Sequence, residues 1–157
     1  MSIPGVKQRV AEVLIAEIGV DMSVFPTPKH LASRAKVCPG NDQSAGKRRS
    51  GKTGKRNKWL RGTLTEAALA ATKTKNSYLA AQYQRLRGRR VHSKAVTAVG
   101  HSILTAAWHM LQTGELYRYL GGDYFTHQNP DQTTRRLIRQ LEALRHTVKL
   151  QPWEAVA

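Results

Sequence analysis

The chain has 157 residues, 40% of them hydrophobic, so it can form one domain with a modest core and is not disordered throughout. It carries 26 lysines and arginines against 10 aspartates and glutamates, and the resulting net charge of +16 indicates a polyanionic partner, either nucleic acid or an anionic membrane. No run of about 18 apolar residues could span a membrane, the opening residues lack the pattern of a secretion signal, and a single cysteine excludes an intramolecular disulfide.

Helical periodicity dominates the chain, and no segment alternates with period two for long enough to predict a strand. Pro28 directly after Thr27 indicates a helix start, whereas Gly19 and Gly114 indicate helix ends. With the spacing of the apolar residues, these signals predict helices over 6–18, 27–36, 59–71, 77–86, 93–113 and 131–146. The predicted fold class is therefore all-α, with about six helices.

Nearly the whole chain is predicted to form one domain, residues 1–150, followed by a tail at 151–157. Residues 40–57 are rich in glycine, serine and basic residues without apolar periodicity, so they are expected to form a long exposed loop. The domain is thus divided into three predicted parts: a helix-hairpin-helix-like unit at 3–36, the basic loop at 40–57 and a helical bundle at 57–146.

Positive charge is concentrated in one part of the chain, which we call the basic belt, residues 47–94. It contains 15 lysines or arginines and a single acid, Glu66. A charge run is usually a solvated face, but such faces mix both signs, and this belt is almost purely cationic. The belt therefore predicts a surface that follows phosphates and whose affinity falls as salt rises.

Three aromatic residues, Trp59, Tyr78 and Tyr83, lie within the belt. Aromatic rings between cations stack on nucleobases in many nucleic-acid-binding proteins. Helical spacing favours core packing for these three, and stacking on bases is the alternative.

Residues 46–53 read GKRRSGKT and match the phosphate-binding pattern G-x-x-x-x-G-K-[ST]. A working P-loop follows a buried strand and opens a helix whose first amides point at the phosphates. The residues before Gly46 cannot form a buried parallel strand, and those after Thr53 do not open an apolar helix. We therefore predict that the match is a coincidence of composition.

The opening segment, Ile3 to Val6, precedes two predicted helices joined by a turn, which resembles a helix-hairpin-helix unit. Such hairpins bind the DNA backbone where glycine allows a phosphate to approach the main chain. Gly5 and Lys7 are the candidate contacts, with Lys7 standing where the usual hairpin has a second glycine. A hairpin that serves packing alone is an equally good interpretation.

Taken together, IPGVKQRVAEVLIAEIG and FPTPKHLASRAKVCPGNDQSAGKRRSGKTGKRNKWLR resemble the C-terminal domain of IS-one-ten-type insertion-sequence transposases. The family pattern joins an IPG hairpin to a loop of the form PG-x-x-x-SxGK-x-x-x-G and a helix start of the form K-x-x-x-LR. A later segment, AVGHSILTAAWHMLQTGELYRYLGGDYF, also resembles the family, so the resemblance covers nearly all of the chain. The matching residues of the loop are Pro39, Gly40, Ser44, Gly46, Lys47 and Gly51, and those of the helix start are Leu60 and Arg61, with Lys58 two residues before Leu60 where the pattern has its lysine four residues before it.

The resemblance implies a role in RNA-guided, serine-dependent transposition or recombination of an insertion sequence. By position, Ser44 is the candidate nucleophile toward a DNA phosphodiester, and its hydroxyl needs a base, a metal or nearby cations to react. Apart from Gly5 and Lys7, the candidate nucleic-acid contacts are Lys47, Arg48, Arg49, Lys52, Lys55, Arg56, Lys58 and Arg61.

Full-length members of the family carry an N-terminal RNase-H-like domain with four acidic metal ligands. The residues before Ile3 cannot hold such a domain, so the chain is expected to be a remnant, a separately encoded part or a late-starting frame. The resemblance implies DNA, a structured guide RNA and a separately encoded N-terminal domain as partners, and a homo-oligomer in the full system. We expect no metal or cofactor in this chain, Mg²⁺ with the missing domain, and a cytoplasmic, nucleoid-associated location in bacteria.

On this interpretation the chain alone is inactive, and whether it takes part in catalysis stays open. The alternative is a non-catalytic nucleic-acid-binding module, either a decayed or a repurposed transposase. A basic helical protein of the ribosome also fits the charge, but it does not account for the SxGK loop.

Overall fold

A computed structural model describes residues 3–38, 42–49 and 57–151 of the chain. It divides into two compact units, Met1–Gly122 and Asp123–Ala157. Each unit is described by itself.

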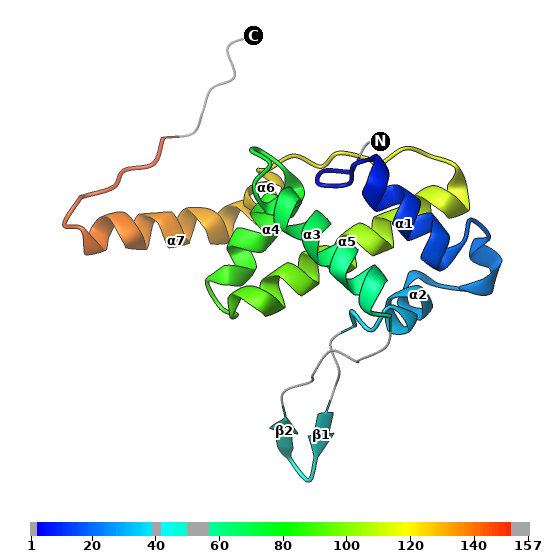
Figure 1. Cartoon of the computed structure of the whole chain (residues 1–157). Coiled ribbons are helices and arrows are strands. Elements are labelled where there is room, and N and C mark those ends of the chain that lie inside the picture. Colours follow the sequence, from blue (N-terminus) through cyan, green and yellow to red (C-terminus); the bar gives the residue numbers. More distant parts are fainter. Residues whose placement is uncertain (1–2, 39–41, 50–56, 152–157) are drawn as a thin grey trace. The chain divides into compact units, whose positions relative to one another are not determined.

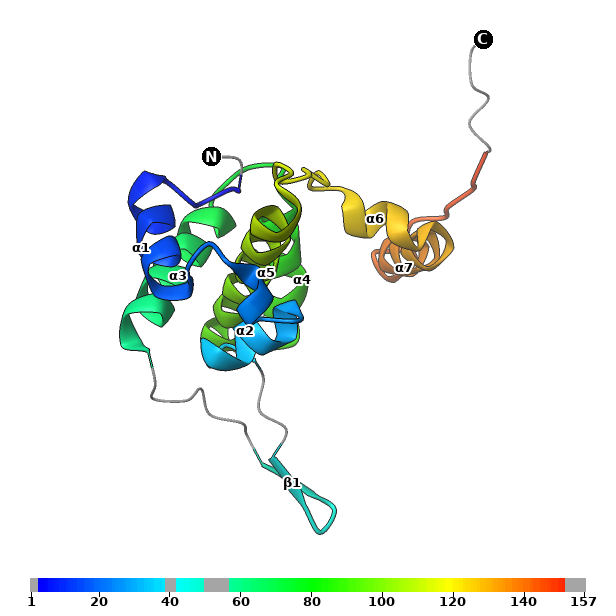
Figure 2. The ribbon, with the colours of Figure 1, turned by 90° about the vertical axis from the view of Figure 1, so that its right-hand side faces the viewer.

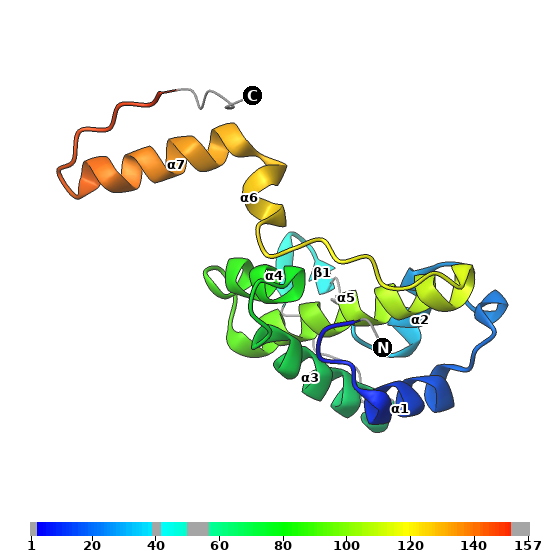
Figure 3. The ribbon, with the colours of Figure 1, turned by 90° about the horizontal axis from the view of Figure 1, so that it is seen from above.

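The first unit is built around one long central helix, α5 (His92–Thr113) (Figure 1). Three helices pack directly against α5, with α2 and α4 toward its two ends (Figure 3). Helix α1 packs on α3, which lies between α1 and α5 (Figure 2). The other helices of this unit are α1 (Gln8–Ile18), the 3-10 helix η1 (Met22–Val24), α2 (Pro28–Arg34), α3 (Lys58–Thr72) and α4 (Tyr78–Arg87).

The core of this unit combines large aliphatic side chains with small ones. Helix α3 turns three alanines inward, Ala67, Ala68 and Ala71, which allows neighbouring backbones to come close. On α5, a Cβ added to Gly100 would lie 3.4 Å from the carbonyl oxygen of Leu64, so the two helices nearly touch there. The largest fully buried aliphatic side chains are Leu31, Leu60, Leu64, Leu79, Val99, Ile103 and Leu104.

The structure confirms the all-α fold class and the helices predicted in this unit, with ends that match the local signals. Helix α2 begins with Pro28 after Thr27 as N-cap, and α5 ends at Gly114 in the left-handed conformation. At the start of α4, the Ser77 hydroxyl accepts a hydrogen bond from the amide of Ala80 at 3.0 Å. These ends form where predicted because each depends on residues next to it in the chain.

Gly5 has a structural function that the sequence does not reveal. Its φ is +81°, and a Cβ there would overlap the carbonyl oxygen of Ala67 and lie 2.7 Å from the amide nitrogen of Ala71. Its neighbours Ile3 and Val6 are buried. The opening segment therefore lies directly on the backbone of α3, and only glycine fits at this point of contact.

The predicted basic loop contains an element that was not expected. Two three-residue strands, β1 (Asp42–Ser44) and β2 (Lys47–Arg49), pair antiparallel. Strands this short are below the length at which alternation can be recognised. The remaining residues of the loop, 40–41 and 50–56, lie outside the described part of the chain.

The second unit contains α6 (Tyr124–Gln128) and α7 (Pro130–Ala143), of which the short α6 was not predicted. No residue of either helix is buried. Three leucines of this unit, Leu137, Leu141 and Leu144, are 42–70% exposed. By its contacts the chain divides at Gly122, inside the predicted domain of residues 1–150. An amphipathic stripe predicts a helix but does not specify which surface covers it.

Among the described residues, no helix is both long and apolar enough to cross a bilayer.

Substituting Gly5 should destabilise the protein far more than substituting another glycine of similar φ. We expect Gly5→Ala to cost roughly 2–5 kcal/mol, because backbone strain adds to overlap with α3. Gly114→Ala is the control, since Gly114 has φ +74° and open space around it, and should cost about 1 kcal/mol. Urea denaturation measures both, and equal losses would show that the contact with α3 is unimportant.

Candidate nucleic-acid interface

The β1–β2 hairpin gives a physical explanation for the SxGK pattern. Ser44 and Lys47 are register partners on opposite sides of a two-residue turn. The turn residues, Ala45 and Gly46, both have positive φ, +49° and +76°. A type I′ turn requires this combination, and it is the turn that best matches the twist of a two-residue hairpin. The pattern therefore places a hydroxyl directly opposite a cation.

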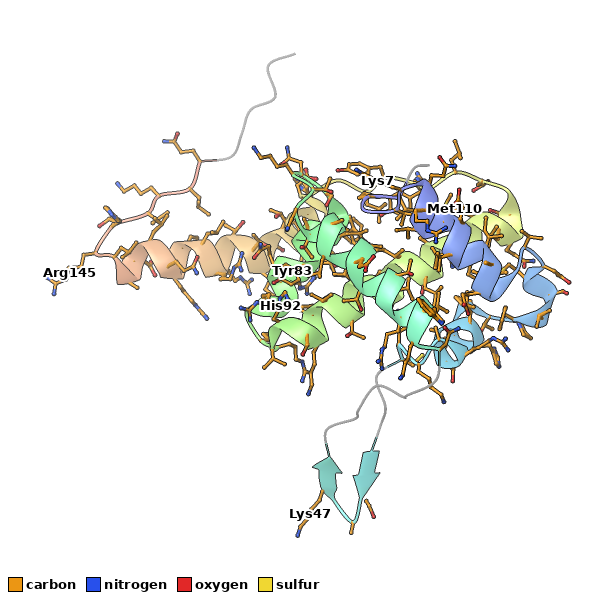
Figure 4. The ribbon with its side chains drawn as sticks, viewed as in Figure 1. Lys7, Lys47, Tyr83, His92, Met110 and Arg145 are labelled. Carbon is orange, nitrogen blue, oxygen red and sulfur yellow. The ribbon has the colours of Figure 1, made fainter. Side chains whose placement is uncertain are left out.

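Both side chains are accessible. Ser44 and Lys47 are exposed, as are the two turn residues, and Figure 4 shows Lys47 at the edge of the hairpin. Residues directly opposite in an antiparallel pair project their side chains from the same face. The hairpin thus presents the Ser44 hydroxyl and the Lys47 ammonium together to a ligand in solution.

This geometry removes the structural context that a P-loop needs. Gly46, the first glycine of the G-x-x-x-x-G-K-[ST] match, lies in the hairpin turn and is followed by strand β2 rather than by a helix. The next helix after the hairpin, α3, begins only at Lys58. Lys52 and Thr53 lie outside the described residues. The described part of the motif supports the interpretation that the match arises from composition.

The N-terminus of α3 is held in place by a contact with α1. Asn57 is the N-cap, with φ +54°, and its Oδ1 accepts a hydrogen bond from the amide of Leu60 at 3.0 Å. Its Nδ2 donates to Oε2 of Glu17, 40 residues earlier, at 2.8 Å. Leu60 is buried, whereas Lys58 is exposed and Arg61 half-buried. The first turn of α3 is thus fixed to the core and carries two of the candidate phosphate contacts.

An open groove of about 270 Å³ runs between the N-terminal halves of α3 and α5. Its lining is mostly apolar, and Arg61 from α3 and His92 and Ser93 from the first turn of α5 contribute polar groups. The N-terminus of α5, the positive end of its dipole, lies at the groove, which favours an anion there. The lining residues are Val37, Arg61, Leu64, Thr65, Leu69, His92, Ser93, Val96, Thr97 and Gly100.

Chain connectivity keeps the hairpin near this α3–α5 groove. Val37 lines the groove, and β1 begins at Asp42, five residues later. Five residues span at most about 18 Å when fully extended. The start of β1 therefore lies within about 18 Å of the groove, whatever path residues 39–41 take.

One side of the groove is bordered by the turn between α4 and α5, where the basic belt ends. The Tyr83 hydroxyl lies 2.8 Å from Nδ1 of His92, and the two rings meet edge to face with centroids 5.8 Å apart (Figure 4). This pair ties the end of α4 to the start of α5. It holds in place a turn of high positive charge, with Arg85, Arg87, Arg89, Arg90 and Lys94 in ten residues.

The three aromatic residues of the belt have different environments. Tyr78 and Tyr83 are half-buried against the core, as their helical spacing predicted. Core packing was also favoured for Trp59, and this is wrong, since its side chain is 79% exposed. The helical position of Trp59 explains the difference, because the adjacent Leu60 points into the core and Trp59 is turned about 100° away from it.

The structure does not bring all the predicted contacts together. Gly5 lies against Ala67 and Ala71, near the C-terminal end of α3, whereas Lys58 and Arg61 lie at its start. Six to thirteen helical residues separate the two places, about 9–20 Å along the axis. Gly5 therefore contacts α3 nearer its C-terminal end than the positions of Lys58 and Arg61.

The other predicted contacts are described only in part. Arg48 and Arg49 lie on β2, and Arg49 pairs in register with Asp42. Lys52, Lys55 and Arg56 lie outside the described residues.

The described residues do not supply a metal site. No group of three or more histidines, cysteines, aspartates or glutamates among them could hold an ion. His101 is half-buried on α5, and desolvation lowers its pKa, which favours a neutral ring at pH 7.

The turn conformation leads to a testable consequence for the hairpin. Ala45 adopts a left-handed conformation that costs a non-glycine residue roughly 1 kcal/mol, and asparagine accepts it more readily. Ala45→Asn should therefore raise the population of the hairpin, and Gly46→Val should abolish it. Amide hydrogen exchange and cross-strand nuclear Overhauser effects between residues 44 and 47 measure both, and a hairpin unaffected by Gly46→Val would exclude the type I′ turn.

Comparisons with known proteins agree with this arrangement. The family described as Transposase IS116/IS110/IS902 matches residues 1–84 of the 157, which include the opening segment, the hairpin, α3 and most of α4. The search of curated proteins found no match. The search of solved structures found none either. Because the family match spans more than half of the sequence, the chain belongs to the IS116/IS110/IS902 transposase family.

Proposed function

We propose that this chain is the DNA-binding C-terminal part of an RNA-guided transposase in which Ser44 is the nucleophile toward DNA. The observation that carries the proposal is the hairpin, which presents an exposed serine directly opposite a lysine in a chain of a transposase family. A serine outside such a setting would be an ordinary turn residue.

The chemistry follows from what each group can do. The Ser44 Oγ bonds to the phosphorus of a phosphodiester, and the bond from phosphorus to one deoxyribose oxygen breaks. The hydroxyl proton goes to a base outside the described residues, and the leaving oxygen takes up a proton. The product is a serine–phosphate diester, from which the reverse attack by a DNA hydroxyl restores the strand. Lys47 stabilises the charge that builds on the phosphoryl oxygens during both steps.

The remaining components come from outside this chain. An acidic RNase-H-like domain would bind Mg²⁺, since the described residues lack a metal-ligating cluster. A structured RNA would pair with target and donor DNA, and the basic belt would hold the nucleic-acid backbone by its phosphates. The isolated 157 residues would therefore bind nucleic acid without cutting it.

A non-catalytic binding module is the second candidate function. The observation that favours it is the same absence of a metal-ligating cluster among the described residues. Both candidates require nucleic-acid binding, and they differ in whether Ser44 becomes linked to DNA.

Binding by the isolated chain should be electrostatic and carried mainly by the basic loop. If Arg48, Arg49, Lys52 and Lys55 all contact duplex phosphates, replacing the four by glutamine should lower the slope of log affinity against log salt by about 3–4. The matched control replaces Arg135, Arg136, Arg139 and Arg145, which removes the same charge from the second unit and should leave the slope nearly unchanged. Titration of a labelled duplex at several salt concentrations gives the slopes. Equal slopes for both variants would place the contact surface elsewhere.

Ser44 should become covalently linked to DNA in a complete system. The chain is combined with a family-type acidic domain, Mg²⁺, the bridging RNA and cognate DNA ends, and the adducts are digested and identified by mass spectrometry. We expect the linkage on Ser44, its loss in Ser44→Ala, and no adduct from the chain alone. Adducts on Ser50, or adducts that survive Ser44→Ala, would exclude the assignment. A system that binds and pairs its DNA but forms no adduct would establish the non-catalytic module.

A further inference from the structure

The exposure of the Trp59 side chain is not explained by the packing of the described residues. This side chain is 79% exposed, although tryptophan is among the most buried residues on average. It lies on the first turn of α3, between Asn57, which caps the helix, and Leu60, which is in the core. The described residues of the unit do not cover this indole, so it is available to a ligand.

The surface next to Trp59 is also unusual. Gly62 follows one turn later on the same side of α3, and no atom lies within 4 Å of where its Cβ would be. A glycine inside a helix costs about 1 kcal/mol relative to alanine, and here packing does not require it. Residues at i and i+3 are neighbours on a helix surface. The helix surface one turn after Trp59 therefore lacks a side chain at Gly62, where a flat ligand can approach the backbone.

The charge around Trp59 indicates which ligand fits. The exposed Lys58 precedes it in the first turn of α3, and both lie in the basic belt, which carries 15 cations and one acid. A protein partner would have to be acidic to cover this surface, and a second copy of this chain would bring further positive charge to it. A polyanion that carries flat aromatic rings satisfies both the charge and the exposed indole, and that description fits nucleic acid with unpaired bases.

We infer that Trp59 is a stacking platform for an unpaired nucleobase at the start of α3. This inference rests on the proposed function and adds the form of substrate, a strand whose bases are not all paired. The Asn57 side chain fixes the start of α3 to Glu17 and to the amide of Leu60, so the position of Trp59 along the helix is set before the ligand arrives. A platform fixed in this way loses little freedom on binding.

Stacking differs from charge attraction in how it responds to salt and to the presence of bases. Loss of the ring should weaken binding by the same factor at every salt concentration, because no phosphate contact is lost. Loss of the ring should leave the affinity unchanged for a strand that has the same phosphates but no bases. A base–aromatic stack contributes enough that its loss weakens binding roughly tenfold.

The test measures affinities of the 157-residue chain for a single-stranded oligonucleotide, the same strand with abasic sites throughout, and the duplex. Trp59→Ala and Trp59→Leu should each weaken binding of the single strand about tenfold, with parallel salt lines, while Trp59→Phe weakens it less. Affinities for the abasic strand and the duplex should change less than about twofold. Leu116→Ala is the matched control, because Leu116 is 80% exposed, and it should change none of the three affinities.

Each alternative gives a different result. Equal losses for the single, abasic and duplex ligands would overturn the stacking role, and so would full rescue by leucine. A change in oligomeric state in Trp59→Ala on sedimentation, with affinities unchanged, would assign the ring to a protein interface instead. If the wild-type chain binds none of the three ligands, the proposed function fails, whereas wild-type binding with no effect of Trp59→Ala overturns this inference alone.

Discussion

Helix α3 is held at both ends and in its middle, and the candidate interface depends on those three contacts. At its start, Asn57 caps the helix and bonds to Glu17 of α1. Near its end, Gly5 allows the opening segment to touch the α3 backbone, and in its middle Leu64 meets Gly100 of α5. Because α3 is fixed in this way, Lys58, Trp59 and Arg61, which form its first turn directly after the cap Asn57, keep constant positions.

The packing of α3 also explains how a surface rich in positive charge is compatible with folding. The inward face of α3 is made of leucine and alanine, so all of its polar and aromatic residues face outward or line the groove. Few acids accompany the cations, and Glu66 is the sole one between residues 47 and 94. The repulsion within such a surface is relieved when a polyanion binds, so the folded state and the nucleic-acid-bound state favour each other.

Under the proposed function, the three features near the start of α3 have separate tasks. The hairpin presents the nucleophile and one cation, the groove and the α4–α5 turn provide further positive charge, and Trp59 discriminates unpaired from paired strands. A metal held by another domain would make the hydroxyl reactive only when the parts assemble on DNA. Separating the serine from its activating groups prevents a basic chain that binds any nucleic acid from cutting it indiscriminately.

Local signals in the sequence determined the helices of the first unit, because a cap, a proline or a glycine acts on the residues beside it. The sequence also determined the charge of the belt and, through the SxGK pattern, the candidate nucleophile. Only the tertiary structure decided that Ser44 and Lys47 face each other, since strands of three residues leave no periodic pattern. It also decided that Gly5 packs on α3 and that Trp59 is exposed. Hydrophobic spacing predicts which residues of a helix share a face, but burial of that face depends on contacts between segments far apart in the chain, such as Asn57 with Glu17.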